Sequence, residues 1–150
     1  MMSTKDQRNF RENLKHSGTR GLFDFWVLTA SIDGLPRISD IRAETLMAWS
    51  DSIVMMKAQS RRNFSYSFYG TSFRKAFGID MTGRSLDKLP PKQADQLRAE
   101  YTSVARKQLP VWRVYSDWFD TGLQTWERIA LPFADASGEV GMIVAGAYRI

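Results

Sequence analysis

The last forty or so residues place the strongest constraint on the fold. They contain three runs rich in Val, Ile, Trp, Tyr and Phe, separated by two short breaks that carry Asp and Gly. The runs are Val111–Phe119, Leu123–Phe133 and Glu139–Arg149, and the breaks are Asp120–Gly122 and Asp135–Gly138. This pattern predicts a meander of three antiparallel strands. Because such a sheet is not stable alone in water, we expect the preceding residues to cover it.

Length and composition indicate one soluble globular domain. The chain has 150 residues, of which 43% are hydrophobic and 25% charged, and a chain of this size buries about two thirds of its extended surface. No apolar run approaches the roughly 20 residues of a membrane span, and residues 1–15 lack the apolar centre of a signal peptide. We therefore expect a cytoplasmic protein that does not contact a membrane.

Charge and residue usage limit the partners and the chemistry. The net charge is +5, but the densest basic groups are pairs such as Arg74-Lys75, which favours a solvated basic surface over nucleic-acid binding. The chain has no Cys, so a disulfide, a thiol nucleophile and a thiolate zinc site are excluded. The single histidine, His16, lies in a polar stretch and is interpreted as solvated. No metal site is predicted.

Two more strands are predicted nearer the middle of the chain. Ser52–Ala58 is apolar and β-prone, and Asn63–Tyr69 alternates aromatic residues with serine. The alternation predicts that Phe64, Tyr66 and Phe68 share one face. Residues 60–63 form the connecting turn. Together with the C-terminal meander, these strands make five.

Helices are predicted on both sides of this first strand pair. Residues 6–15 and 19–31 form N-terminal helices, and the second carries a wide stripe of Leu22, Phe25 and Trp26. Short helices follow at 72–77 and 85–89. A long helix begins at Pro90-Pro91, where proline suits the first turn, and ends before Pro110. The order predicts an α+β fold with a helical flank and connector over residues 1–51 and a core over residues 52–150.

This order of elements resembles a PAS domain, and several motifs agree with it. Phe68–Gly78 is similar to the second PAS strand passing into a short helix, although Gly70 stands where the family usually has Asn. Residues 82–86 resemble the turn that opens the next helix, and residues 137–144 resemble the last hairpin. The resemblance implies a five-stranded antiparallel sheet with short central helices, one long connecting helix and N-terminal flanking helices.

A narrower resemblance is to proteobacterial, mostly single-domain PAS-like proteins of largely unknown function. It is carried by Trp26 on an N-terminal helix, the connector Leu35–Asp40 and the turn Gly83-Arg84. It extends the likeness back to about Gly21. It bears on the fold more than on function.

The resemblance to PAS domains implies a sensor or an interaction module, and the residues limit the cofactor. A flavin photoadduct needs a Cys, which the chain lacks. A His-ligated haem is disfavoured because His16 is far from the central helices in sequence, while ligation by Met or Tyr stays open. The identity of any cofactor is therefore not predicted.

A small apolar or aromatic ligand would suit the space between the long helix and the sheet. The candidate lining residues are Phe64, Tyr66, Phe68, Phe77, Met81, Leu97, Tyr101 and Trp126. The alternative is that these residues are simply core, which is the commoner role of such stripes. The small residues Gly141, Ala145, Gly146 and Ala147 either leave room for a ligand or let a helix pack closely on the last strand.

Aromatic residues also suggest an interface on the other face of the sheet. Strand alternation puts Trp112 and Trp118 on the same face, where Phe25 and Trp26 of the second helix could meet them. Docking within the chain and formation of a homodimer are both open. Docking within the chain is slightly favoured.

No catalytic constellation is apparent, so we predict a protein that is not an enzyme. The sequence shows no nucleophile with a base and no phosphate loop, and the neighbours Glu127 and Arg128 are interpreted as charges along a strand ladder. The prediction is a PAS-like sensory domain that binds a small ligand or a protein partner and signals through a separate protein. The alternatives are a dimerising module without a ligand, a weak nucleic-acid binder and a small enzyme built on a curved sheet.

Overall fold

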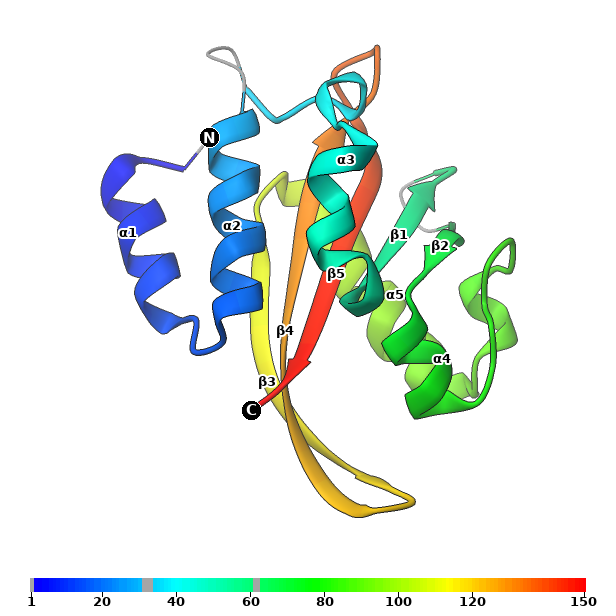
Figure 1. The fold of residues 1–150 in the computed structure, drawn as a ribbon. Coiled ribbons are helices and arrows are strands. Elements are labelled where there is room, and N and C mark those ends of the chain that lie inside the picture. The colour runs from blue at the N-terminus through cyan, green and yellow to red at the C-terminus, as the bar shows by residue number, and fades with distance from the viewer. Residues whose placement is uncertain (1, 31–33, 61–62) are drawn as a thin grey trace.

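A single antiparallel sheet organises the computed structural model, which describes residues 2–30, 34–60 and 63–150. Its five strands run in the order β2-β1-β5-β4-β3 (Figure 1). The strands are β1 (Ile53–Ala58), β2 (Phe64–Tyr69), β3 (Val111–Phe119), β4 (Gly122–Ala134) and β5 (Val140–Arg149). The predicted single layer of five antiparallel strands is therefore confirmed.

Two tight turns join the last three strands, as predicted. Asp120 and Thr121 connect β3 to β4, and Gly122 begins β4 with a φ of 117°, which favours glycine. The second turn is closed by a hydrogen bond from the Gly138 N–H to the Asp135 carbonyl at 3.1 Å. The Asp135 carboxylate also accepts hydrogen bonds from Ser137. In Figure 1 the β3–β4 hairpin extends well beyond the helices.

A β-bulge in the first strand pair corrects one predicted orientation. The partner of Met55 is Phe68, but the partner of Met56 is Tyr66, so β2 contains one extra residue at Ser67. The extra residue reverses the alternation. Phe68 therefore faces away from Phe64 and Tyr66 and is 37% exposed, while Tyr69 takes the buried place. The two arginines of the predicted turn, residues 61 and 62, lie outside the described residues.

The inner face of the sheet is covered by the helices between β2 and β3. These are α4 (Thr71–Phe77), the short 3-10 helix η3 (Leu86–Lys88) and α5 (Pro91–Lys107). They pack on the sheet through a core that includes Val54, Met56, Tyr101, Val104 and Ala145. Gly78, with a φ of 71°, ends α4 in the left-handed conformation. The predicted long helix is thus confirmed, and with α4 and η3 it forms a helical roof over the inner face.

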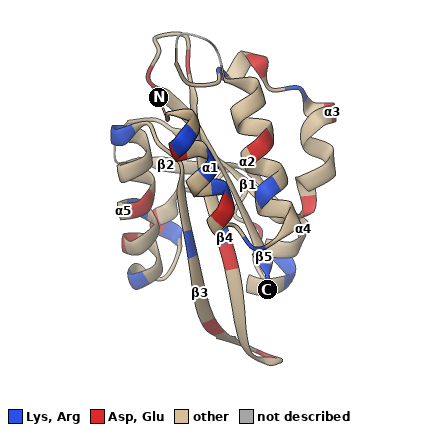
Figure 2. Cartoon of the chain, turned by 90° about the vertical axis from the view of Figure 1, so that its left-hand side faces the viewer, with Lys and Arg blue, Asp and Glu red and all other residues tan. Residues whose placement is uncertain are grey.

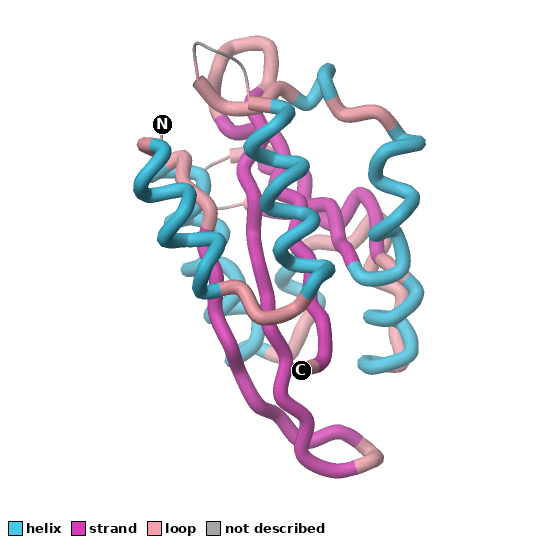
Figure 3. The backbone as a smooth tube through the Cα atoms, turned by 60° about the vertical axis from the view of Figure 1, so that its left-hand side comes forward, coloured by secondary structure: helices cyan, strands magenta, loops and turns pink. Residues whose placement is uncertain are grey.

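The outer face is covered by the N-terminal part of the chain. Helices α1 (Thr4–Asn13) and α2 (Ser17–Thr29) lie side by side on it (Figure 3), joined by a stack of Phe10 on Phe23. The short helices η1 (Ile38–Asp40), α3 (Ala43–Leu46) and η2 (Met47–Ser52) cover the rest. The predicted end of the second helix at residue 31 lies outside the described residues.

Close contact between α2 and the sheet depends on one small residue of β5, Gly146. A Cβ on Gly146 would lie 2.4 Å from Leu22 Cδ1, so a larger residue here would displace the Leu22 side chain or the helix. Trp26 is fully buried and donates a hydrogen bond from its indole nitrogen to the Pro132 carbonyl at 2.7 Å. Helix packing therefore explains Gly146, whereas Ala145 and Ala147 belong to the inner core.

Glu127 anchors the N-terminal helices to the sheet. It lies in the β3–β4 ladder opposite Val114, as predicted, but the sequence did not indicate that it is buried. Its side chain is fully buried on the outer face. The carboxylate accepts hydrogen bonds from the backbone N–H groups of Lys15 and His16 at 2.7 and 2.9 Å, and from the Trp112 indole at 3.2 Å. It also bonds the Thr19 hydroxyl. The burial of Glu127 was not foreseen because three of its four donor residues, Lys15, His16 and Thr19, lie more than 100 residues away in sequence.

His16 also makes more contacts than the sequence suggested. Its Nδ1 accepts a hydrogen bond from the Gly18 N–H at 2.8 Å and so caps the first turn of α2. The ring stacks on Tyr148 of β5, with centroids 4.4 Å apart. The histidine therefore helps to dock α2 and is not simply solvated.

Replacing Glu127 with Gln should destabilise the protein by about 2–3 kcal/mol. The amide puts N–H donors where the carboxylate meets only donors, and unsatisfied buried donors carry a cost of this order. Urea unfolding followed by tryptophan fluorescence measures the loss. Glu12→Gln on the exposed surface of α1 is the matched control and should change the free energy of unfolding very little. Equal stability of the two variants would contradict the anchoring role.

Candidate functional site

A cleft of about 440 Å³ opens on the inner side of the sheet. It lies between α4, the first two turns of α5 and the face of the sheet formed by β1, β2, β3 and β4. Its volume falls within the range of about 300–1,000 Å³ that is typical of small-molecule sites. The lining residues are Val54, Tyr66, Tyr69, Phe73, Phe77, Pro90, Lys92, Gln93, Gln96, Leu97, Arg113, Tyr115, Ser116, Asp117 and Arg128.

The structure brings some of the predicted ligand residues together and separates others. Tyr66, Phe77 and Leu97 line the cleft. Trp126 lines a much smaller cavity of about 10 Å³ beside it, which Phe77 shares and which is about large enough for one water molecule. The remaining three inward-facing residues, Phe64, Met81 and Tyr101, are buried in the core. Phe68 is on the opposite face.

Three side chains form an ion-pair chain across the base of the cleft. Glu100 of α5 accepts hydrogen bonds from Nε of Arg113 at 2.7 Å and from Nε of Arg128 at 3.0 Å. Arg128 also donates from Nη2 to the Tyr101 hydroxyl. The side chains of Glu100 and Arg128 are 8% and 7% exposed. Arg128 lies in the β3–β4 ladder opposite Arg113, as predicted, but it is also a buried charge beneath α5, which the sequence did not indicate.

Burial and charge set the protonation of these groups. Burial alone would raise the pKa of Glu100, but Arg128 and Arg113 outweigh it and hold that pKa below its ordinary value. Burial raises the pKa of Tyr66 and of Tyr69 to about 12. At neutral pH the cleft therefore combines ionised Glu100 and arginines with neutral phenols that can donate hydrogen bonds.

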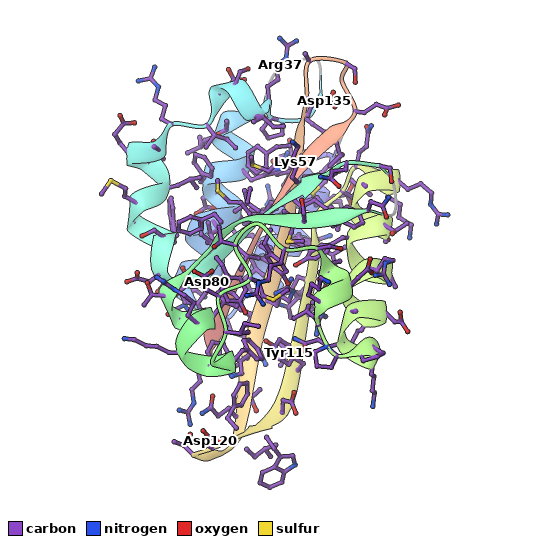
Figure 4. The ribbon with its side chains drawn as sticks, turned by 90° about the vertical axis from the view of Figure 1, so that its right-hand side faces the viewer. Arg37, Lys57, Asp80, Tyr115, Asp120 and Asp135 are labelled. Carbon is purple, nitrogen blue, oxygen red and sulfur yellow. The ribbon has the colours of Figure 1, made fainter. Side chains whose placement is uncertain are left out.

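Aromatic rings form the wall opposite α5. Tyr66 and Tyr69 meet edge to face with centroids 5.2 Å apart, and Phe73 lies 5.6 Å from Tyr69. Figure 4 shows Tyr115 of β3 between α4 and α5. The guanidinium of Arg113 is 4.8 Å from the centre of the Tyr115 ring, a cation–π distance. A flat ring entering the cleft would meet aromatic faces on this side.

Sequence reasoning missed several lining residues, and a signal existed for only some of them. Residues of β3 at odd positions, including Arg113 and Tyr115, lie opposite the face predicted for Trp112, so alternation could have found them. Tyr69 could not be found in this way, because the bulge is not visible in the sequence. Arg128 required knowledge that Glu100 lies across from it.

The predicted interface residues divide into buried and exposed ones. Trp26 is buried within the chain, and Phe25 packs on Trp49 and Phe133 with centroids 5.8 and 6.3 Å away. Trp112 and Trp118 share the outer face, as the register requires. Trp112 binds Glu127, whereas Trp118 is 76% exposed on the β3–β4 hairpin. Only Trp118 of the four is free to meet a partner without rearrangement.

Charged residues are interspersed on the surface. In the cartoon of Figure 2, basic and acidic residues both occur on α1, α2 and α5. Among the described residues, no three His, Asp or Glu side chains are grouped so that they could hold a metal ion. Within the same residues, no helix has the length and apolar character needed to cross a membrane.

Comparison with known families identifies this arrangement of sheet, roof and cleft. Residues 14–148 match the PAS domain family. The chain belongs to this family. The match confirms the resemblance seen in the sequence, while the narrower proteobacterial likeness stays a prediction. A search of curated proteins finds none that matches this chain.

Solved structures with the PAS fold are similar to the chain at low sequence identity. The PAS domain of BvgS from Bordetella pertussis has a TM-score of 0.57 and 14% identity, covering 86% of this chain and 85% of that one. A sensory box sensor histidine kinase from Vibrio cholerae has a TM-score of 0.55 and 13% identity, covering 72% and 88%. VqmA bound to DPO has a TM-score of 0.56 and 12% identity, covering 73% and 57%.

The pKa of Glu100 predicts how stability depends on pH. Because the folded pKa lies below the unfolded value of about 4.3, the folded state gains stability above the unfolded pKa and loses it as pH falls through the folded one. The free energy of unfolding should therefore fall from about pH 5 to pH 3, and less steeply in Glu100→Gln. Urea unfolding at a series of pH values measures both slopes, and parallel slopes would show that Glu100 is not held in its charged form.

Proposed function

We propose that this PAS domain is a sensory module whose inner cleft binds a small ligand with an aromatic part. The observation that carries the proposal is the cleft itself, with a volume of about 440 Å³ and walls formed by α4, α5 and the sheet. Five of its lining residues carry aromatic rings: Tyr66, Tyr69, Phe73, Phe77 and Tyr115. Aromatic walls with a few fixed polar groups are typical of small-molecule sites.

The relatives support a sensory role. One similar structure is a sensor histidine kinase and another is VqmA bound to DPO. We propose that this chain likewise changes its contacts when the cleft is filled, and that a separate protein reads the change.

We propose that the module is not catalytic. The described residues lining the cleft include one carboxylate, Asp117, and no histidine, so they offer no nucleophile paired with a base. A flavin thiol adduct is disfavoured since the sequence lacks Cys. His16 docks α2 on the outer face, which disfavours its use as a haem ligand at the cleft.

Filling the cleft with a larger side chain should abolish ligand retention. Gln96 is exposed on α5 and lines the cleft, so Gln96→Trp adds bulk without disturbing the core. Native mass spectrometry of the purified protein, with release and identification of any small molecule, compares the variant with the unchanged protein. We expect a bound small molecule in the unchanged protein and none in Gln96→Trp.

Ala99→Trp is the matched control, because Ala99 is exposed on the same helix but does not line the cleft. It should retain the ligand. Equal retention of the ligand by Gln96→Trp and Ala99→Trp would show that the ligand binds outside the cleft. The proposal is wrong if two tests of the unchanged protein both fail. In the first, the purified protein retains no small molecule. In the second, no member of an aromatic metabolite library raises its melting temperature.

A second candidate function, association of two copies, is favoured by one surface. The outer face of the β3–β4 hairpin exposes Trp118 by 76%, Leu123 by 55% and Val114 by 38%, and Trp118 is the cross-strand partner of Leu123. Clustered exposed aromatic and aliphatic residues are typical of interface centres. We propose that this face is the contact between the two copies of a homodimer.

Replacing Trp118 with Ser should weaken any self-association by at least roughly tenfold, because central aromatic anchors contribute about 2 kcal/mol or more. Sedimentation velocity over a series of protein concentrations measures it. Leu28→Ser on α2 removes an equally exposed apolar side chain away from the hairpin and should change nothing. A monomer at all concentrations, or equal effects of both variants, would remove this candidate.

A further inference from the structure

We propose that the inner cleft selects an anion, and specifically a planar aromatic carboxylate of one or two rings. This inference rests on the proposed function of the cleft and names the chemical class of its ligand. The sequence alone suggested an apolar or aromatic ligand without charge. The structure adds cationic groups that the sequence did not reveal.

The first observation is the buried guanidinium of Arg128. Its side chain is 7% exposed and lines the cleft. Nε donates to Glu100 and Nη2 to Tyr101, so Nη1 has no partner among the described residues. A guanidinium carries five N–H donors in one plane, and the unused ones match the two oxygens of a carboxylate. Since no buried side-chain nitrogen among the described residues lacks a partner, Nη1 is open to the cleft, where it can donate to an anion.

The second observation is the charge around Arg128. The walls of the cleft carry the cationic groups Lys92, Arg113 and Arg128 and the single carboxylate Asp117, while Glu100 bridges the two arginines from behind. The lining with Glu100 therefore has one positive charge in excess. That excess suits a monoanion better than a dianion or a neutral ligand.

The third observation is the start of α5 at the mouth of the cleft. Pro90, Lys92 and Gln93 all line it, and no side chain of the described residues caps the first turn of this 17-residue helix. The backbone N–H groups of that turn have no partner within the helix. These N–H groups favour an anion at the cleft, as Arg128 does.

The opposite wall explains why the anion should carry a ring. Tyr66 meets Tyr69 edge to face there, Phe73 lies tilted against Tyr69, and Tyr115 lines the same cleft. Aromatic faces bind flat rings through offset or edge contacts. A carboxylate on Arg128 would place an attached ring against this wall, and the neutral phenols can donate to a ring substituent.

Titration calorimetry on the whole chain can test the class with matched probes. The probes are 4-hydroxybenzoate and indole-3-carboxylate, each compared with its own carboxamide, which has the same shape without the charge. We expect at least one acid to bind, and to bind roughly tenfold or more tightly than its amide, because charge-assisted bonds are about twice as strong as neutral ones. Added salt should weaken the binding of the acid and leave the binding of the amide unchanged.

Two variants locate the charge recognition. Lys92 is on the exposed first turn of α5, so Lys92→Gln should fold. It should weaken the binding of the acid several-fold, because Lys92 lines the cleft. Lys88→Gln, outside the cleft, should not change the binding. Arg128→Lys keeps the charge but loses the planar guanidinium, and it should weaken the binding of the acid more than Lys92→Gln does. A thermal melt of each variant separates loss of binding from loss of folding, and Lys92→Gln decides the matter if Arg128→Lys does not fold.

The remaining outcomes each overturn the inference. Equal binding of acid and amide would leave the cleft as a ligand site and remove the anionic class. Binding of inorganic phosphate but of neither acid would remove the aromatic part. Binding of no probe overturns the inference too, while a small molecule retained by the unchanged protein and lost in Gln96→Trp would still uphold the proposed function.

Discussion

The structure depends on two neighbouring charges on one strand. Glu127 and Arg128 of β4 point to opposite faces of the sheet, and each is buried. Glu127 binds the segment between α1 and α2 on one side, while Arg128 binds Glu100 of α5 on the other. A buried charge without partners is strongly unfavourable. The two helical layers are thus fixed to the same point of β4. Neither layer can shift without leaving a buried charge without its partners.

The sequence was sufficient for the framework because strands and turns leave local signals. Val111–Phe119 and its two successors are bounded by turns that contain Asp and Gly, and Pro90-Pro91 sets the start of α5. Those signals depend on residues a few positions apart. The bulge at Ser67 is different, because its cause lies in pairing with β1, and no feature of β2 alone distinguishes Phe68 from Tyr69 as the buried residue.

The cleft was less predictable for the same reason. Its aromatic wall includes Tyr66 and Phe77, which the alternation and spacing suggested, but its charges arise from pairs that are distant in sequence. Glu100 and Arg128 are 28 residues apart, and Glu127 meets Lys15 across 112 residues. Short-range patterns show that a charged residue occurs within an apolar strand, yet its partner is known only once the sheet is assembled.

The phenols of the cleft have a consequence for how the domain would respond to its surroundings. Tyr66 and Tyr69 have a pKa of about 12, Glu100 is held below its ordinary value, and no histidine is among the described lining residues. The walls therefore keep one hydrogen-bonding pattern from mildly acidic to mildly alkaline conditions. A sensory domain built in this way would respond to the concentration of its ligand, and its response would change little with pH.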